Sequence, residues 1–213
     1  MPVVVQTASL LTGDGEPSVV GPRVRDSAER ALAADPTLAE AQFVHGYYRW
    51  LLQWDWAGAE REMRQAVALD PQYADATRTL GHALSQMARH GDAEAFMRRT
   101  WATEPLDPMA YGISAQVAFQ ARDFDHAVRL AERAIALEPT FWVGHIQLAQ
   151  AEVARGHSDV ALAAVTDAEQ LSGRNSKAVA LRGHLLAILG RVKKARALLD
   201  ALDDASQHRY VPP

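Results

Sequence analysis

Hydrophobic and polar residues alternate with a helical period along most of the chain. Pairs of stretches, each about a dozen residues long, place apolar residues three and four positions apart, which is the pattern of an amphipathic helix. One pair is residues 109–120 and 126–139, with a short polar turn between them. Either Asp123 or Asp125 in this turn could cap the second helix by accepting a backbone N–H. Each pair of stretches therefore predicts a helical hairpin.

The hairpins recur at a nearly constant spacing. Four second stretches close with Asp-Pro or Glu-Pro, at Pro36, Pro71, Pro105 and Pro139, and the successive intervals between these prolines are 35, 34 and 34. Because the residue before a proline disfavours the α-helical backbone conformation, each of these pairs is expected to end a helix. A fixed period of this size is the sequence signature of a protein built from stacked repeats.

Small residues recur at two phases of the same period. One phase holds Ala59, Ala93, Ala127, Ala161 and Ala195; the other holds Gly81, Ala115, Ala149 and Gly183, with Gly46 one residue out of step. Small residues let two helix axes approach closely, and alanine, at 40 of 213 residues, favours helices in general. Since one hairpin cannot cover its own apolar face, we expect an all-α solenoid of stacked antiparallel helix hairpins.

A helical hairpin of this repeat length, with two small positions and a closing proline, resembles the tetratricopeptide repeat. The resemblance covers residues 37–205 as five units that begin near residues 39, 74, 108, 142 and 176. Residues 1–36 resemble a degenerate unit with its second helix at about 22–34, and residues 206–213 form a tail. The family implies a right-handed superhelix whose first helices line a concave face.

A narrower resemblance rests on the stretch WDWAGAEREMRQAVALDP (residues 54–71) and on HRYVPP at the carboxyl end. These stretches are similar to tetratricopeptide arrays of bacterial multidomain regulators, which carry winged-helix, nucleotidyl-cyclase or kinase domains. None of those domains is in this sequence. The resemblance implies the regulatory part of a signalling protein, with the tail opening a further helix.

Composition narrows the classes of partner. The chain has 22 basic and 26 acidic residues, so a nucleic-acid partner is disfavoured. It has no long uninterrupted apolar run, so no membrane span is expected, and its amino terminus is a poor secretory signal. The absence of cysteine fits a reducing compartment. Together these features favour a cytoplasmic protein.

Motifs that would carry catalysis are absent from the sequence. It contains no HExxH, GxSxG or GxxxxGK[ST] motif, and its eight histidines form no pair four residues apart. We therefore predict no enzyme, no cofactor and no metal site, and we expect His45 and His145 to be structural and at least half-buried. A hydrolase or transferase site assembled from separate units is the disfavoured alternative.

The first helices carry an aromatic and neutral-polar set of side chains. If these helices line a concave face, the set forms a groove suited to a peptide, which would gain apolar burial and directed hydrogen bonds together. Phe43, Trp50 and Phe119 could instead only pack on adjacent helices. The candidate groove residues are Phe43, Tyr47, Trp50, Arg78, His82, Gln116, Phe119, Gln120, Gln150 and His184.

Two further features concern exposed apolar residues. Trp54 and Trp56 are expected to wedge between helices, although an exposed aromatic lip is the alternative. Leu198, Leu199 and Leu202 lie on the last helix, where the chain's own tail, a second copy or further sequence would have to cover them.

The two ends of the array and its groove suggest two functions. Residues 2–12 are expected to form a truncated first helix before a turn at residues 13–17. The leading hypothesis is a non-catalytic module that binds a protein or peptide in a concave groove. The alternative is a structural scaffold, a homo-oligomer formed through uncapped solenoid ends.

Overall fold

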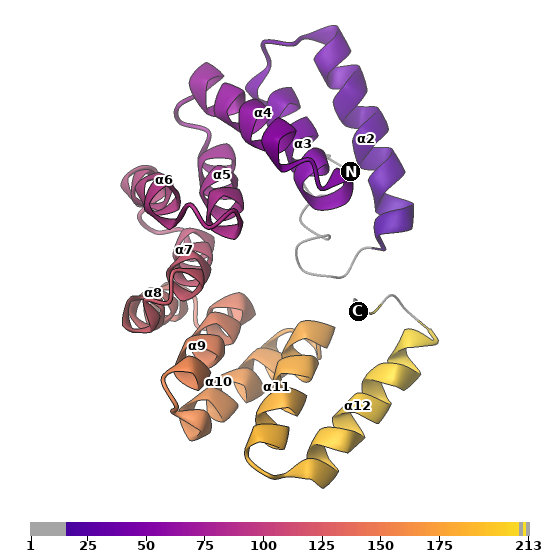
Figure 1. Cartoon of the computed structure of the whole chain (residues 1–213), viewed down its shortest axis with the longest axis vertical. Coiled ribbons are helices and arrows are strands. Elements are labelled where there is room, and N and C mark those ends of the chain that lie inside the picture. The colour runs from indigo at the N-terminus through magenta and orange to yellow at the C-terminus, as the bar shows by residue number, and fades with distance from the viewer. Residues whose placement is uncertain (1–15, 209–210, 212–213) are drawn as a thin grey trace. The chain divides into compact units, whose positions relative to one another are not determined.

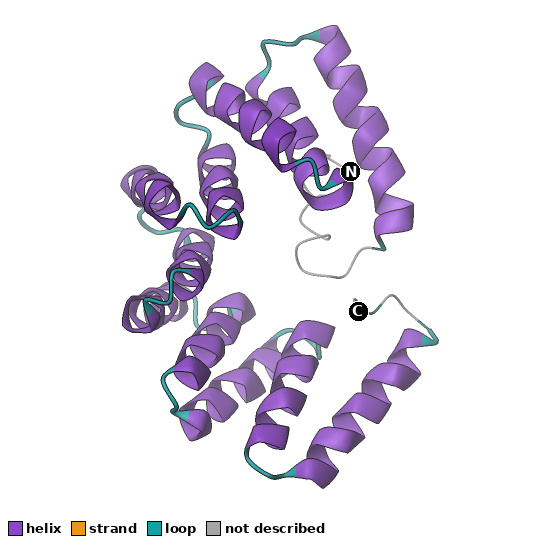
Figure 2. Ribbon diagram, in the orientation of Figure 1, coloured by secondary structure: helices purple, strands orange, loops and turns teal. Residues whose placement is uncertain are grey.

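The computed structural model of the chain describes residues 16–208 and 211, and within these residues the regular structure is helical throughout, with no strand (Figures 1 and 2). The predicted all-α class of antiparallel helix hairpins is confirmed. The predicted helix at residues 2–12 lies outside the described residues, as does half of the tail. The chain divides into two compact units between Pro105 and Leu106.

The described part of unit 1, residues 16–105, contains a single helix followed by two hairpins, and each of these helices packs against the next one in the chain. The single helix is α2, and the hairpins are α3 with α4 and α5 with α6 (Figure 1). The helices are α2 (Pro17–Ala34), α3 (Ala39–Tyr48), α4 (Trp56–Leu69), α5 (Ala74–Gln86) and α6 (His90–Thr103), with a π-helical turn η1 (Arg49–Gln53) continuing α3.

Helix α2 begins at Pro17, whereas the sequence places the start of this helix near residue 22. Proline is well suited to the first turn, because the N–H that it lacks has no partner there. Pro22, which the sequence pattern treats as the start, lies inside the helix. With Pro17 and Pro22 only five residues apart, the sequence alone does not show which of the two begins the helix.

The π-helical turn explains why the first hairpin is out of step. The interval from Gly46 to Gly81 is 35, whereas the interval from Ala59 to Ala93 is 34, so the extra residue lies between Gly46 and Ala59. The turn η1 occupies this part of the chain. Because a π-helical turn holds more residues than an α-helical one, it accommodates the extra residue within the helix.

Small residues bring the two helices of each hairpin in unit 1 together. A β-carbon added at Gly46 would lie 3.2 Å from the Ala59 carbonyl oxygen, and one at Gly81 would lie 3.2 Å from that of Ala93. Ala59 and Ala93 are themselves buried. Larger side chains fill the space around these close approaches, and those fully buried in unit 1 include Trp50, Met63, Leu80, Leu84 and Met97.

Unit 2 contains three hairpins built in the same way, and each helix packs on the next. Its buried core includes Ala149, Ala161, Ala164 and Val165, which Leu185 of the last hairpin covers. The helices are α7 (Pro108–Gln120), α8 (Phe124–Leu137), α9 (Trp142–Ala154), α10 (Ser158–Leu171), α11 (Ser176–Ile188) and α12 (Val192–Ser206).

The ends of the helices follow the sequence signals. Helices α2, α4, α6 and α8 each stop one residue before the acidic residue of an Asp-Pro or Glu-Pro pair. Of the two candidate caps for α8, Asp123 is the cap, since its carboxylate accepts the His126 N–H at 3.0 Å. Asp125 instead forms an ion pair with Arg155 at 2.9 Å.

A left-handed residue closes the first helix of each of the five hairpins within residues 39–206. The residues at this position have φ between 57° and 84°, and they share one place in the repeat: Trp54, Ala88, Arg122, Gly156 and Gly190. A left-handed residue just after a helix satisfies its last carbonyl groups, and glycine adopts this conformation at the lowest cost. Three of the five hairpins therefore close on a residue for which the conformation is unfavourable.

Candidate functional site

An aromatic cluster fills the interior of unit 1 where α3 and η1 meet α5. Phe43 packs edge-on against Tyr47 and Tyr73, with ring centroids 5.8 and 5.2 Å apart. Trp50 packs edge-on against Tyr47 and His82, at 5.6 and 5.1 Å. Such edge-to-face pairs stabilise aromatic rings beyond the area that they bury. The cluster thus joins the first helices of two successive hairpins.

Polar groups at one edge of this cluster are hydrogen-bonded to each other. The Trp50 indole N–H donates to Gln86 Oε1 at 3.0 Å, and the Gln86 amide lies 3.3 Å from His82 Nε2. Burial, together with the nearby Asp75 carboxylate, raises the pKa of the Tyr47 phenol well above its ordinary value. Tyr47 is therefore neutral at physiological pH.

Four of the predicted groove residues lie in the interior of unit 1. Phe43, Tyr47, Trp50 and His82 are each at most 4% exposed. Arg78, the fifth predicted residue in this unit, is half-buried and forms an ion pair with Asp75. The packing alternative thus describes Phe43 and Trp50 in this structure, and their direct contact with a peptide stays a prediction.

A network of ion pairs joins α3, the π-helical turn η1 and α4. Glu62 accepts from His45 Nδ1 at 2.7 Å and pairs with Arg49 Nε at 2.9 Å. Arg49 also contacts Asp55 at 2.5 Å. The Gly58 backbone N–H, followed by the Arg49 guanidinium, holds the pKa of the Asp55 carboxyl below its ordinary value. This network fixes η1 against α4, and it confirms a structural role for His45.

The expectation that Trp54 wedges between helices is wrong. Trp54 is 70% exposed, and its ring packs edge-on against that of Trp56 at 6.0 Å. Its φ of 57° marks it as the left-handed residue that closes the hairpin, a position at which Ala88 and Arg122 are also exposed. The repeat position therefore directs this indole to solvent, despite its size.

Unit 2 carries a row of hydrogen-bonding side chains at one repeat position. Gln116, Gln150 and His184 follow one another at intervals of exactly one repeat. They are the ninth residues of α7, α9 and α11, and these three helices have 13 residues each. Gln116 and Gln150 are half-buried, and His184 is exposed. The row therefore presents two amides and an imidazole at matched positions on successive first helices.

Two further predicted residues lie one turn along from this row, on α7. Phe119 and Gln120 are both half-buried, and the Phe119 ring packs against Phe124 at 5.6 Å. The Gln120 Oε1 atom is buried and accepts no hydrogen bond from the described residues. A buried acceptor without a donor is unfavourable, so this face has an unsatisfied polar group.

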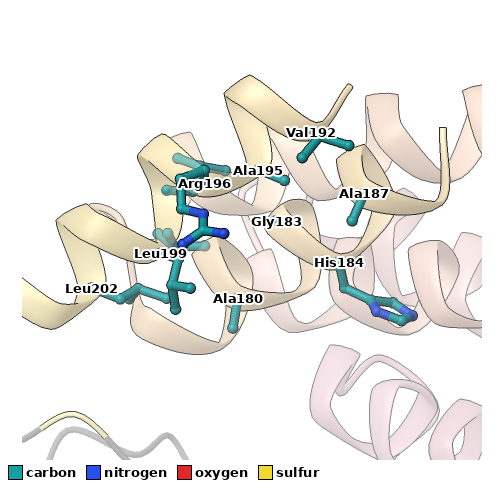
Figure 3. A pocket seen from close by; sticks show the side chains of 11 residues that line it. Ala180, Gly183, His184, Ala187, Val192, Ala195, Arg196, Leu199 and Leu202 are labelled. Carbon is teal, nitrogen blue, oxygen red and sulfur yellow. The ribbon is translucent and has the colours of Figure 1, made fainter. Parts of the chain in front are cut away.

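An apolar groove lies between α11 and α12, at the carboxyl end of unit 2 (Figure 3). Its volume is about 410 Å³, and no residue of α12 is buried. Leu199 is 52% exposed, whereas Leu198 and Leu202 are half-buried. The residues that line it are Val179, Ala180, Gly183, His184, Ala187, Val192, Ala195, Arg196, Leu198, Leu199 and Leu202.

The sequence predicts that the three leucines need a cover and that His184 is a binding residue, but it does not predict the groove that joins them. Apart from Arg196, the groove's remaining lining residues are small or apolar, and they form a recognisable set only when the repeat is applied to the previous hairpin. No group of three or more His, Cys, Asp or Glu side chains in the described part of the chain is arranged to hold a metal ion. None of the described helices is both long and apolar enough to cross a membrane.

Comparison with known proteins identifies the repeat in one part of the chain. Residues 51–117 match the model of the tetratricopeptide repeat family. U-box domain-containing protein 70 of Oryza sativa subsp. japonica is 27% identical to this chain over 105 residues. That match spans 49% of this chain and 13% of the U-box protein.

Solved structures of tetratricopeptide solenoids have the same fold. The APC/C hetero-tetramer Cut9–Hcn1 matches with a TM-score of 0.76 and 18% identity, over 92% of this chain and 38% of that one. PilW, a widely conserved type IV pilus biogenesis factor, matches with a TM-score of 0.74 and 18% identity, over 97% of this chain and 94% of that one. The narrower resemblance to arrays of bacterial multidomain regulators is not confirmed by these matches.

Proposed function

We propose that this chain, in which residues 51–117 carry a tetratricopeptide repeat, is a non-catalytic module that binds a protein or peptide on the faces of its first helices. Proteins with this fold generally mediate protein–protein interaction. The observation that carries the proposal is the row of Gln116, Gln150 and His184 at one repeat position of unit 2.

The chemistry of this row suits the backbone of a bound segment. Each glutamine amide both donates and accepts, and a neutral imidazole does the same with its two nitrogens. A row of such groups can pair with successive N–H and C=O groups of a peptide, each hydrogen bond contributing about 0.5–1.5 kcal/mol. The half-buried side chains of Gln120 and Phe119 add a further amide and apolar area.

In unit 1 the proposed binding residues play a supporting part. Arg78 and Gln86 are the more accessible groups there, whereas Phe43, Tyr47, Trp50 and His82 hold α3 against α5. A partner that binds this unit would therefore contact Arg78 and Gln86 first. The four buried residues support Arg78 and Gln86. They would contact a partner directly only if the side chains that cover them moved.

The test is partner capture by the whole chain with the row removed. A Gln116→Ala, Gln150→Ala, His184→Ala variant is expected to lose bound proteins while keeping its helical circular dichroism. The matched control is Gln170→Ala, which removes an exposed amide from the second helix α10. Equal capture by the triple variant and the control would refute the proposed surface.

The wider setting is also a proposal. The chain spans 13% of the U-box relative and 38% of the Cut9–Hcn1 chain, so arrays of this kind occur within much longer proteins. We extend the proposal to the regulatory part of a cytoplasmic bacterial signalling protein, which residues 54–71 and the carboxyl end support by resemblance. A reading frame without an adjoining regulatory domain would refute this extension.

A further inference from the structure

The groove between α11 and α12 has an internal counterpart that shows what it is shaped to hold. In the preceding hairpin of unit 2, α9 and α10 supply a buried surface on which α11 packs through Leu181 and Leu185. The residues that α9 and α10 supply there are Trp142, Ile146, Leu148, Ala149, Val153, Ala161, Leu162, Ala164, Val165 and Ala168.

Advancing eight of these ten residues by one repeat gives a residue that lines the groove, whereas Trp142 and Leu148 advance to Ser176 and Arg182, which do not. The eight groove residues are Ala180, Gly183, Ala187, Ala195, Arg196, Leu198, Leu199 and Leu202. The groove is therefore the next copy of a surface that already holds a helix in this protein. An amphipathic helix with leucine-like side chains four residues apart is the occupant that this shape fits.

Helix α12 itself is amphipathic, with an apolar seam in place of the Leu181 and Leu185 pair of α11. Val192, Ala195, Leu199 and Leu202 are spaced by three, four and three residues, which is the a and d spacing of a two-helix seam. Val192 is 62% exposed and Leu199 is 52% exposed. Figure 3 shows these side chains on α12, beside Ala180 and Ala187 of α11. The chain thus carries both a groove for a helix and a helix with a suitable face.

Charge determines the direction in which a second α12 would lie. The first half of α12 carries Lys193, Lys194 and Arg196, and the second half carries Asp200, Asp203 and Asp204. All six are exposed, and none of them forms an ion pair within the part of the chain that the structure describes. Two such helices side by side attract when antiparallel and repel when parallel.

The same charge order is unfavourable for a helix standing alone. Helix termini favour acidic residues in the first turn and basic residues in the last, whereas α12 has neither. An antiparallel second copy offsets this arrangement, because it brings an acidic half and a helix carboxyl end beside each basic first turn.

We propose that two copies of this chain associate about a twofold axis near Leu199, with each α12 lying antiparallel on the groove of the other copy. Arg196 of each copy then lies level with the acidic half that contains Asp203 of the other. His184 of the proposed partner-binding row also lines the groove, so the substitutions that test this interaction change only residues of α12.

The first experiment measures the mass of the whole chain by light scattering and sedimentation across the micromolar range. We expect a concentration-dependent dimer that Leu199→Glu weakens by about tenfold or more, because a charge would enter the centre of the seam. Val160→Glu is the matched control, since Val160 on α10 is 51% exposed and is expected to leave the dimer intact. A strict monomer, or a dimer insensitive to Leu199→Glu, overturns the proposal.

The second experiment uses charge alone, so it does not depend on how an apolar substitution affects folding. Lys193→Glu, Lys194→Glu, Arg196→Glu makes α12 wholly acidic, and Asp200→Lys, Asp203→Lys, Asp204→Lys makes it wholly basic. Each variant alone is expected to be monomeric, and an equimolar mixture is expected to form a heterodimer that salt weakens.

Combining all six reversals in one chain provides the internal control. The combined variant has acidic residues in the first half of α12 and basic residues in the second, which the helix dipole favours, so it is expected to fold. Its two halves are again opposite in charge, so it is expected to recover the antiparallel dimer. Failure of both the mixture and the combined variant to associate overturns the antiparallel arrangement. A dimer that forms only after residues 209–213 are removed would assign the groove to the chain's own tail, which also overturns the proposal.

Discussion

Gly81 on α5 faces Ala93 on α6 so closely that a β-carbon at Gly81 would lie 3.2 Å from the Ala93 carbonyl oxygen. The same β-carbon would lie 3.1 Å from Phe96 Cβ and would also overlap the Met97 methyl group. This hairpin therefore closes on backbone atoms, which cannot turn aside as a flexible side chain can.

Gly81→Ala is expected to destabilise the chain by about 1–3 kcal/mol, because the two helices must move apart. Gly183 is the matched control, since it holds the same repeat position in the last hairpin, where the nearest atom to an added β-carbon is Leu198 Cβ at 3.8 Å. Gly183→Ala is expected to be neutral or stabilising. Urea unfolding of both variants checks the pair, and equal losses would contradict the close-approach account.

The left-handed turn position allows a test that involves no packing. Ala88→Gly is expected to raise the free energy of unfolding by about 0.5–1 kcal/mol, since glycine adopts a positive φ without steric cost. Gly156→Ala, at the equivalent turn, is expected to lower it by about 1 kcal/mol. Nothing lies within 4 Å of a β-carbon at Gly156, so the backbone alone is responsible.

Thermal unfolding measures both turn variants. The control is Gly91→Ala, since Gly91 lies in α6 without a left-handed backbone and has no atom within 4 Å of an added β-carbon. Alanine there is expected to be neutral or stabilising. A loss at Gly91 as large as that at Gly156 would contradict the role of the turn conformation.

Trp50 and Trp54 are four residues apart and are expected to differ sharply in stability. Trp50→Ala removes a ring that is 2% exposed and is expected to cost about 3–5 kcal/mol. Trp54→Ala removes a ring that is 70% exposed and is expected to change stability by at most about 0.5 kcal/mol. Chemical denaturation of the two variants distinguishes them, and a large loss at Trp54 would restore the wedge interpretation.

The buried phenol of Tyr47 predicts a loss of stability at alkaline pH. Its pKa in the folded chain is raised by burial, so the folded state favours the neutral form. The contribution to stability is complete below the ordinary pKa of about 10 and declines as the pH rises above it. Tyr47→Phe is expected to reduce this decline.

Urea unfolding of the wild type and of Tyr47→Phe at pH 8 and at about pH 10.5 provides the comparison, since the second pH lies above the ordinary pKa of tyrosine. The informative quantity is how the difference between the two proteins changes with pH, because the hydroxyl also affects stability at neutral pH. A difference that is constant with pH would contradict a buried neutral phenol.

The constant repeat length explains how much of the fold the sequence could predict. The Asp-Pro and Glu-Pro pairs locate the hairpins because they end helices locally. Gly81 and Ala93 also mark a hairpin, because two closely packed helices need small residues where they meet. Asp123 could be proposed as a cap but not distinguished from Asp125, since both lie within reach of the same helix end.

The candidate site is harder to predict because exposure depends on the helix face and on what lies above it. His82, Gln116, Gln150 and His184 share one repeat position, yet His82 is buried and His184 is exposed. The π-helical turn also lacks a sequence signal of its own, apart from an interval that is one residue too long. The wedge prediction for Trp54 fails because its turn position, rather than its size, decides where the ring lies.

The widened turn at residues 49–53 shows where an array of this kind tolerates a change in length. A residue added there bulges within a single coil, and the following helix still presents Ala59 and Met63 to the interior. This segment is therefore a suitable site for changing the length of the chain. A further residue at that turn is expected to leave α5 and α6 in register, whereas an insertion beside Gly81 is expected to rotate a buried helix face toward water.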